Sequence, residues 1–311
     1  MAKTNKAEIM KLCKEINDKS GQGSLYTLDS KYANLKIDRW STGIEDLDAI
    51  IGGGMPEGRI VEVFGPESSG KTTLLYHLCG LQPLCLDIPV EGTFDAKRAK
   101  VFGNKKGQML IYRANVGEDA LNKSIKFAKA GIPLIGIDSV PSLLPKDDIE
   151  KVLKSSEKDS VEEQRIGGTA RLLNKYLPVL EDIIEKTGTT VVLVNQVRDK
   201  MNAMMFGEKT DTPGGRKLKH AASLRIQVAR RAWIEIPNKN PHNSATSEKI
   251  GMIMKCKVVK SKVCDPMGEC EIPLFFDRGF VSYSDMKDIR KQIMKSRAEQ
   301  FGKRVPKEFL E

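Results

Sequence analysis

The stretch "RIVEVFGPESSGKTTLLYHLCG", residues 59–80, decides the fold of this 311-residue chain. Its first part, "RIVEVFGP", is a continuous apolar strand pattern, and "KTTLLYHLCG" has the pattern of a helix. Between them, "GPESSGKT" matches G-x-x-x-x-G-K-[ST] in the strand–loop–helix context that this motif requires. A Gly/Ser turn that matches by chance is the alternative, and the flanking strand and helix disfavour it.

This loop has the composition of a phosphate-binding site. Its glycines allow backbone N–H groups to converge on phosphate oxygens, and the helix N-terminus adds partial positive charge. We expect Lys71 to reach the β- and γ-phosphates of a nucleotide and Thr72 to hold Mg²⁺. The predicted nucleotide-binding residues of the loop are Gly65, Pro66, Glu67, Ser68, Ser69, Gly70, Lys71, Thr72 and Thr73.

Apolar strands and helices alternate on the carboxyl side of this loop. Strand patterns occupy residues 83–91, 132–140 and 189–196, and helical patterns occupy residues 118–131 and 168–188. Strands that are apolar on both faces and alternate with helices predict an α/β fold with a doubly wound, mostly parallel sheet. Three later strand patterns, at residues 223–236, 250–262 and 270–281, have no helices between them and predict antiparallel strands at one edge.

Polar residues end several of these strands. Asp138 ends "LIGIDS" and is predicted to help hold the metal ion, although a helix N-cap is the alternative. Hydrolysis also needs a group that orients and deprotonates water, and Glu91 and Asp87 both lie at the end of the 83–91 strand. Gln196, at a neighbouring strand end, could contact the γ-phosphate through its amide and sense whether ATP or ADP is bound.

Composition limits the class of protein. The net charge of +10 and the pI near 9.2 favour a polyanionic partner without proving one. No apolar run approaches the roughly 20 residues that span a bilayer, and no secretory signal is evident, so we expect a cytoplasmic protein. The six cysteines form no CxxC pair, which disfavours a zinc ribbon. We expect reduced thiols, with Cys264 and Cys270 facing each other across a "DPMGE" turn.

An ordered series of motifs extends the argument beyond the phosphate loop. "IDSVPSLLPK", "VNQVRDKM", "MFG", "GGRKLKHAASLRI" and "KVVKSK" follow "STGIEDLDAIIGGGMPEGRIVEVFGPESSGKTTL" in this order. Over about residues 7–283 the sequence resembles the RecA family of homologous-recombination ATPases. The resemblance implies a RecA-like P-loop NTPase core at 37–283 and a polymerisation helix and strand at 1–36. Residues 284–311 have a charged helical pattern that predicts a short basic tail, and here the chain departs from the family, whose bacterial members carry a further domain and an acidic tail.

The resemblance implies roles for individual residues. Glu91 matches the family's water-activating glutamate, but three residues separate it from Asp87 where the family has one, so Asp87 stays an alternative. Gln196 matches the residue that couples the γ-phosphate to the DNA-binding loop. Lys260 and Lys262 match paired lysines that reach ATP across the subunit interface, and hydrolysis should therefore require a filament.

The adenine environment departs further from the family's pattern. Asp95 matches a family acid near the base, but Arg98 stands where an aromatic residue is usual. Phe276 occupies another stacking position. Guanidinium stacking or a cation–π contact could replace the missing aromatic ring.

Two DNA-binding loops are implied, at about residues 146–171 and 197–216. Ile166 and Met201 match apolar side chains that wedge between groups of stacked bases, which offsets the cost of unstacking. Positions that match phosphate contacts are Arg171, Arg198, Gly214 and Gly215. Such contacts supply affinity that depends on salt and not on base sequence.

The implied function is an ATP- and DNA-dependent recombinase that uses ATP and Mg²⁺. The protein would form a helical filament of many copies on single-stranded DNA and exchange strands with homologous double-stranded DNA. A RecA-fold hexameric helicase or ring motor is the main alternative. A DNA-coating protein that uses ATP only as a switch is a further one.

Overall fold

A computed structural model describes residues 5–21, 25, 27, 37–92, 94–102, 108–154, 167–199, 210–237 and 247–300. The chain divides into two compact units, residues 1–38 and residues 39–311. In the first unit, α1 (Lys6–Ser20) begins where the Asn5 side chain accepts a hydrogen bond from the Glu8 N–H. The Asn17 amide bonds both backbone groups of Leu25. Most of the predicted strand at residues 24–28 lies outside the described residues.

The second unit contains the predicted alternation and several short elements that the sequence analysis did not assign. Its helices are α2 (Glu45–Ile50), α3 (Lys71–Gly80), α4 (Ala96–Phe102), α5 (Gly117–Lys129), η1 (Val140–Ser142), α6 (Lys146–Lys154), α8 (Gly168–Thr187), α9 (Gly215–Ala221) and α10 (Tyr283–Gln300). Its strands are β1 (Arg39–Trp40), β2 (Met55–Pro56), β3 (Ile60–Gly65), β4 (Leu84–Pro89), β5 (Gln108–Ile111), β6 (Leu134–Asp138), β7 (Thr190–Gln196), β8 (Arg198–Asp199), β9 (Thr210–Asp211), β10 (Leu224–Pro237), β11 (Ser247–Ser261), β12 (Glu269–Phe275) and β13 (Gly279–Phe280).

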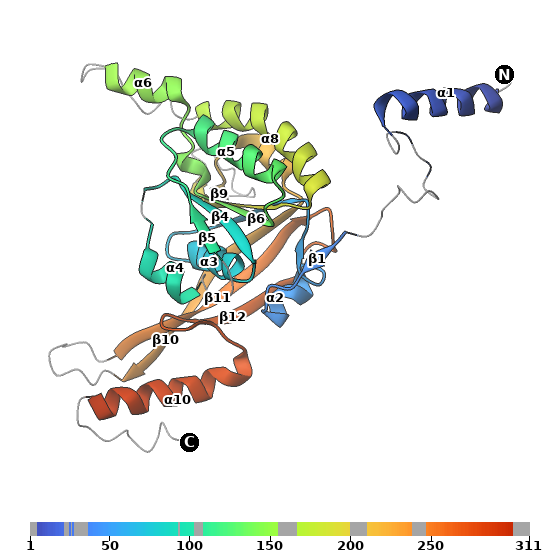
Figure 1. Cartoon of the computed structure of the whole chain (residues 1–311). Coiled ribbons are helices and arrows are strands. Elements are labelled where there is room, and N and C mark those ends of the chain that lie inside the picture. Colours follow the sequence, from blue (N-terminus) through green and yellow to red (C-terminus); the bar gives the residue numbers. More distant parts are fainter. Residues whose placement is uncertain are drawn as a thin grey trace. The chain divides into compact units, whose positions relative to one another are not determined.

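Nine strands form one sheet in the order β13-β12-β11-β10-β3-β7-β6-β4-β5. The six strands from β10 to β5 pair in parallel. The other three, β11, β12 and β13, pair antiparallel at the β10 side (Figure 1). The mostly parallel α/β sheet with antiparallel edge strands is therefore confirmed.

The two faces of the sheet pack different helices because successive side chains of a strand point to opposite faces. On β7, Val192 and Val194 join a core cluster that includes residues of α2 and α3. Val191 and Leu193 join a second cluster that includes residues of α5, α8 and α9. All four valine and leucine side chains are buried, which explains why the strand is apolar on both faces.

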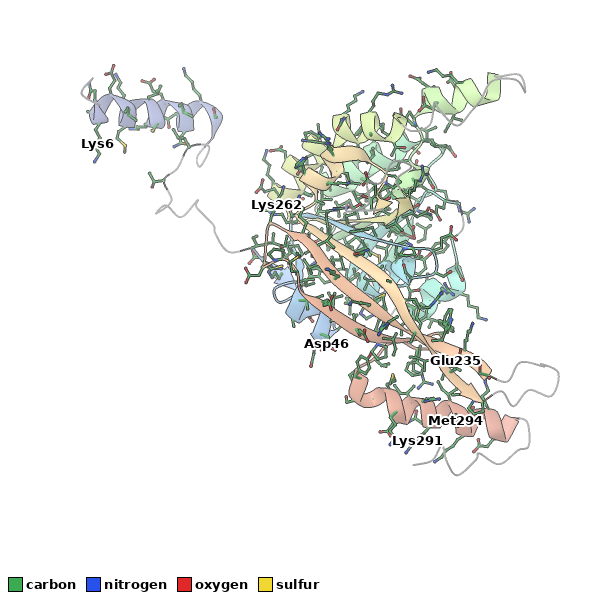
Figure 2. All side chains as sticks on the ribbon, turned by 180° about the vertical axis from the view of Figure 1, so that it is seen from behind. Lys6, Asp46, Glu235, Lys262, Lys291 and Met294 are labelled. Atoms are coloured by element: carbon green, nitrogen blue, oxygen red, sulfur yellow. The ribbon has the colours of Figure 1, made fainter. Side chains whose placement is uncertain are left out.

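The C-terminal helix packs on the far end of the long β10–β11 hairpin. Met294 of α10 is 5% exposed and clusters with Ile234, Ile236 and Ile250 of the hairpin and with Phe275. Figure 2 shows Met294 on the side of α10 that faces the hairpin, near Glu235, and Lys291 on the opposite side. The predicted helical tail therefore has an apolar side, which contributes to a small satellite core. None of the helices in the described ranges is long and apolar enough to cross a membrane.

The expected contact between Cys264 and Cys270 is wrong. Cys270 lies directly opposite Cys256 in the register of β11 and β12, and a thiol–thiol hydrogen bond links the two. Cys264 instead bonds the hydroxyl of Ser261. The chain turns nearer to Met267, whose N–H bonds the Val258 carbonyl, so the residue opposite Cys270 comes from the strand and not from the turn. The six cysteines are free thiols.

Candidate active site

The phosphate loop connects the end of β3 to the start of α3, and its backbone conformation depends on glycine. Gly70 has φ +91°, and a Cβ there would lie 2.7 Å from Met252 Cε. A Cβ on Gly65 would lie 1.9 Å from the Val228 carbonyl oxygen. Backbone of the neighbouring strand therefore excludes a side chain at Gly65, whereas at Gly70 the positive φ and the end of the Met252 side chain disfavour one.

The loop offers donors to an anion. Lys71 Nζ donates to the carbonyls of Gly65 (3.0 Å) and Pro66 (2.6 Å), so the ammonium group lies inside the loop. Burial lowers the pKa of Lys71, while the nearby carboxylates of Asp138, Glu91 and Glu67 raise it. Within the described residues, the backbone N–H groups of positions 67–69 donate to no protein acceptor. This arrangement can bind a phosphate chain.

Asp138 and Thr72 bring two hard oxygen atoms together. Thr72 Oγ1 donates to Asp138 Oδ2 at 2.6 Å. Burial raises the pKa of Asp138, whereas the Thr72 hydroxyl lowers it. A hydroxyl and a carboxylate are ligands that Mg²⁺ accepts. In the described part of the chain no group of three or more His, Cys, Asp and Glu side chains could hold a metal ion. Thr72 and Asp138 therefore offer a hydroxyl oxygen and a carboxylate oxygen as candidate ligands.

Glu91 and Asp87 have different surroundings. Glu91 is exposed, and its Oε1 accepts hydrogen bonds from Ser139 Oγ and from Gln196 Nε2, the latter at 3.0 Å. Asp87 is completely buried, and its carboxylate oxygens have no hydrogen-bond partner beyond a weak contact with the Ile88 N–H. Burial, then the negative charge of Asp138, raises the pKa of Asp87 to about 8. Of the two carboxylates, Glu91 is therefore the one that solvent water can reach.

The residues expected around adenine are exposed and lie in two segments. Asp95 caps α4 by accepting from the Arg98 N–H at 2.9 Å, and the two side chains also form a long ion pair of 4.0 Å. Phe276 follows β12, is 42% exposed and packs edge-to-face against Trp233 at a centroid distance of 6.3 Å. Within the described residues, Arg98 and Phe276 therefore have different partners, Asp95 for Arg98 and Trp233 for Phe276.

The two lysines near the end of β11 differ in their contacts. Lys260 Nζ donates to three carbonyls at the C-terminal end of α9, those of Lys219, His220 (3.0 Å) and Ala222 (2.8 Å). Burial, then the positive charges of Lys262 and Arg225, lowers the pKa of Lys260 to about 8. Lys262 is exposed. Figure 2 shows Lys262 at the opposite end of the sheet from Glu235.

The expected DNA contacts are described only in part. Ile166 and Met201 lie outside the described residues. Arg171 is exposed on the first turn of α8, and Arg198 is exposed on β8, directly after the Gln196 strand. Gly214 and Gly215, with φ of +101° and +71°, begin α9 at the other end of the same loop. Thus β7 ends at Gln196, beside Glu91, and the predicted DNA loop begins directly after it.

Sequence reasoning missed four polar residues around this site. Ser139 bonds Glu91, and Glu62, Asn195 and Arg225 form a buried group beneath the base of α9. A signal existed for Glu62 and Arg225, because each is a charged residue within an otherwise apolar strand, in "RIVEVFGP" and "SLRIQV". Buried charges are normally paired, so the two could have been predicted as partners.

Comparisons with known proteins agree with this architecture. A family model described as the RecA N-terminal domain matches residues 7–281. Protein RecA of Campylobacter fetus subsp. fetus is 37% identical over 281 residues, which cover 88% of this chain and 76% of that protein. Protein RecA of Campylobacter hominis is 36% identical with the same coverage. Protein RecA of Mycoplasma mycoides subsp. mycoides SC is 34% identical over 291 residues, 92% of this chain and 79% of that protein.

Proposed function

The chain belongs to the RecA family, and from this premise we propose that it is an ATP- and DNA-dependent recombinase. It forms a helical filament on single-stranded DNA and catalyses homologous pairing and strand exchange with double-stranded DNA. ATP hydrolysis to ADP and phosphate at subunit interfaces drives turnover of the filament.

ATP binds at the phosphate loop. The backbone N–H groups of residues 67–69 and the ammonium group of Lys71 hold its phosphates, and their position at the start of α3 supports this assignment. Thr72 and Asp138 hold Mg²⁺, which neutralises charge on the β- and γ-phosphates when it is bound. Asp95, Arg98 and Phe276 are proposed to surround the base.

Glu91 orients the attacking water and accepts its proton. Ser139 and Gln196 both donate to the same oxygen of Glu91, which fixes the direction of the carboxylate. When ATP is bound, Gln196 can exchange its contact with Glu91 for a contact with the γ-phosphate. That exchange frees Glu91 for water and moves the start of the following loop.

Lys260 and Lys262 complete the site of a neighbouring subunit. They supply positive charge to the γ-phosphate as the transition state develops, in the manner of arginine fingers. A site that needs residues from two copies is active only in an assembly, so hydrolysis follows filament formation. The N-terminal segment 1–36 is proposed to hold adjacent copies together.

DNA binds through two loops. Arg171, Arg198 and the backbone at Gly214 and Gly215 contact phosphates, and Ile166 and Met201 insert between groups of bases. The net charge of +10 supports this polyanionic partner. Sequence is recognised by base pairing between strands, so the protein needs no base-specific contacts.

The hydrogen bond of 3.0 Å between Gln196 and Glu91 is the observation that best supports this function. It joins a hydrolytic carboxylate to the residue that precedes a predicted DNA loop, which a simple nucleotide switch would not need. The helicase alternative has no such specific support.

A strand-exchange assay tests the proposal. Circular single-stranded DNA and homologous linear duplex should give joint molecules with the protein, ATP and Mg²⁺, and heterologous duplex is the control. Electron microscopy of the same mixture should show open helical filaments. Closed rings together with an absence of joint molecules would instead support a ring motor.

A further inference from the structure

Four polar side chains form a row across neighbouring strands of the sheet. Arg225 of β10 is the direct register partner of both Glu62 of β3 and Lys260 of β11. Glu62 pairs with Leu193 of β7, and Asn195 lies two residues further along that strand. Because side chains alternate along a strand, Glu62, Arg225 and Asn195 share the face that packs against α8 and α9. We call Asn195, Glu62, Arg225 and Lys260 the polar row.

Asn195 holds both ends of the second predicted DNA loop. Its Oδ1 accepts from the Gln196 N–H at 2.9 Å, where the loop begins. Its Nδ2 donates to the Pro213 carbonyl at 2.8 Å, where the loop ends, and to Glu62 Oε1 at 2.8 Å. The amide is completely buried. The Asn195 side chain thus bonds the residue next to it and a residue 18 positions further along the chain.

Glu62 and Arg225 form the centre of the row. Glu62 is fully buried, and its Oε2 accepts from Arg225 Nε at 2.5 Å. Arg225 Nη2 reaches the hydroxyl of Thr212, also at the end of the loop, at 3.2 Å. The guanidinium group lies 4.7 Å from the ring centroid of Phe64. Removing both charges of an ion pair from water has a large desolvation cost. A contribution to stability therefore does not by itself explain why Glu62 and Arg225 form a pair here.

Helix α9 is attached to the row at both ends. Thr212 and Pro213 precede its N-terminal end and bond Arg225 and Asn195, whereas Lys260 bonds the carbonyls of its last turn. The row therefore connects the strand that leads into the phosphate loop, the end of the DNA loop and the lysine that acts on ATP of a neighbouring subunit.

We propose that Glu62 is a positioning residue that anchors both ends of the second DNA loop to the phosphate-loop strand and thereby couples DNA binding to ATP hydrolysis. Glu62 touches neither nucleotide nor DNA and acts through Asn195 and Arg225. The inference rests on the proposed function, because stimulation of hydrolysis by DNA is what the anchor transmits. Without the anchor, DNA can still bind the loop, but the two ends of the loop are no longer fixed to β3 and β10.

The test uses the full chain and compares hydrolysis with and without single-stranded DNA. Glu62→Gln keeps the shape of the side chain and an acceptor for Asn195 but loses the charge that holds Arg225. We expect basal ATP hydrolysis to be unchanged and stimulation by oligo(dT) to fall by about tenfold, a usual size for coupling between sites. Glu185→Gln, which removes the exposed contact with Arg59 at the distant end of β3, is the matched control and should behave as wild type.

Because Glu62→Gln leaves a buried guanidinium unpaired, it can unfold the protein. The double variant Glu62→Gln/Arg225→Met removes both charges and should fold, and it should show the same loss of stimulation. Thermal denaturation establishes folding. A purely structural role would lower basal and stimulated rates in proportion, and that result, or unchanged stimulation in the folded double variant, would overturn the inference.

A second readout does not need DNA. Trypsin can cleave the loop after Arg198, Lys200 or Lys209, and we expect faster cleavage there in both variants than in wild type and Glu185→Gln. Equal cleavage rates would contradict the anchor. Wild-type protein that is not stimulated by oligo(dT) would instead overturn the proposed function, while faster cleavage in the variants would still support the anchor itself.

Discussion

Charged groups are held differently in two regions of the molecule. We call the region of Lys71, Asp138 and Glu91 the nucleotide edge, and the region of Lys260 and Lys262 the lysine end of β11. At the nucleotide edge, Lys71 bonds the end of β3, Asp138 bonds Thr72 at the start of α3, and Glu91 bonds Ser139 directly after β6. At the lysine end, Lys260 is held by backbone carbonyls of α9, and Lys262 is exposed. Lys71 also bonds backbone carbonyls of its own chain, but it lies inside the phosphate loop, whereas Lys260 lies at the end of α9 and is proposed to act on a neighbouring subunit.

From the proposed role of Lys260 and Lys262 in a neighbouring subunit, we expect little ATP hydrolysis by a single subunit. Preorganised donors lower the barrier only when all of them surround the reacting group. In the single subunit, Lys260 bonds carbonyls of its own chain. We therefore expect the rate of hydrolysis to depend on assembly.

Replacing both lysines gives the largest expected effect and tests the comparison directly. Lys260→Met/Lys262→Met should bind ATP normally but lose DNA-stimulated hydrolysis by about 10³-fold or more, as for loss of an arginine finger. Steady-state ATPase and ATP binding by filter retention provide the measurements. An equal mixture with Glu91→Gln protein should recover roughly a quarter of the wild-type rate, because that share of head-to-tail interfaces has both intact halves. No recovery on mixing would place the lysines in the same site as Glu91 of their own chain.

Glu91→Gln alone tests the nucleotide edge. Hydrolysis should fall by about 10²- to 10⁴-fold, since a general base is lost, while ATP-dependent filament assembly persists. Stopped-flow phosphate release and microscopy separate the two effects. Asp87→Asn is the companion variant, and a larger loss of hydrolysis there than in Glu91→Gln would make Asp87 the base.

Gly70→Ala asks whether the nucleotide edge is as rigid as its contacts indicate. The alanine needs φ near +91° and brings its methyl group within 2.7 Å of Met252 Cε. Backbone strain of about 1–3 kcal/mol predicts roughly 5- to 150-fold weaker nucleotide binding. Equilibrium binding of a fluorescent ATP analogue measures this, and Gly131→Ala, at positive φ on an open turn, controls for strain without crowding. Equal affinity in the two variants would show that the loop can rearrange.

The smallest effect concerns pH at the lysine end. Burial and nearby positive charges lower the pKa of Lys260 to about 8, below its ordinary value of 10.5, because both disfavour the charged form. Above pH 8, Lys260 must therefore take up a proton before it can bind a phosphate. Assembly on single-stranded DNA with ATP should weaken with rising pH, by at most about tenfold per pH unit. Lys260→Arg should remove this dependence in a light-scattering titration from pH 7 to 9.5, and an unchanged slope would contradict the assignment.

The lowered pKa of Lys260 also makes the stability of the folded protein depend on pH. A lysine whose folded pKa is lowered destabilises the native state while it is charged in both states, that is, below about pH 8. Between pH 8 and its unfolded pKa that cost disappears, so Lys260 contributes a gain in stability as pH rises through this window.

The alternation of strands and helices along the chain was predictable because strands that are buried on both faces are apolar and have helices between them. Asp138 and Gln196 could be placed at strand ends for the same reason. The partner of Cys270 could not, because the register of an antiparallel pair depends on how many residues the turn consumes. Likewise, Lys260 bonds backbone carbonyls, which every residue type has, so the sequence could not indicate these partners.

Short elements were missed where they depend on tertiary packing. Helix α2 has six residues, too few for a periodic pattern, and Leu47 holds it against the core. Edge strand β5 has only four residues, and three of them are exposed, so its sequence has no clear strand pattern. The charged member of an apolar strand, Glu62, was the strongest signal that the sequence analysis left unused.

The hydrogen bonds of Asn195 with Gln196 and Pro213 also have a consequence for protein engineering. Since one buried amide fixes the chain at Gln196 and at Pro213, the intervening segment begins and ends at set points. Doubling the length of a segment with fixed ends costs only about 0.6 kcal/mol of closure entropy. The segment is therefore suited to exchange as a cassette: longer, shorter or foreign sequences can be grafted between these two points while the ATP-binding scaffold is left intact.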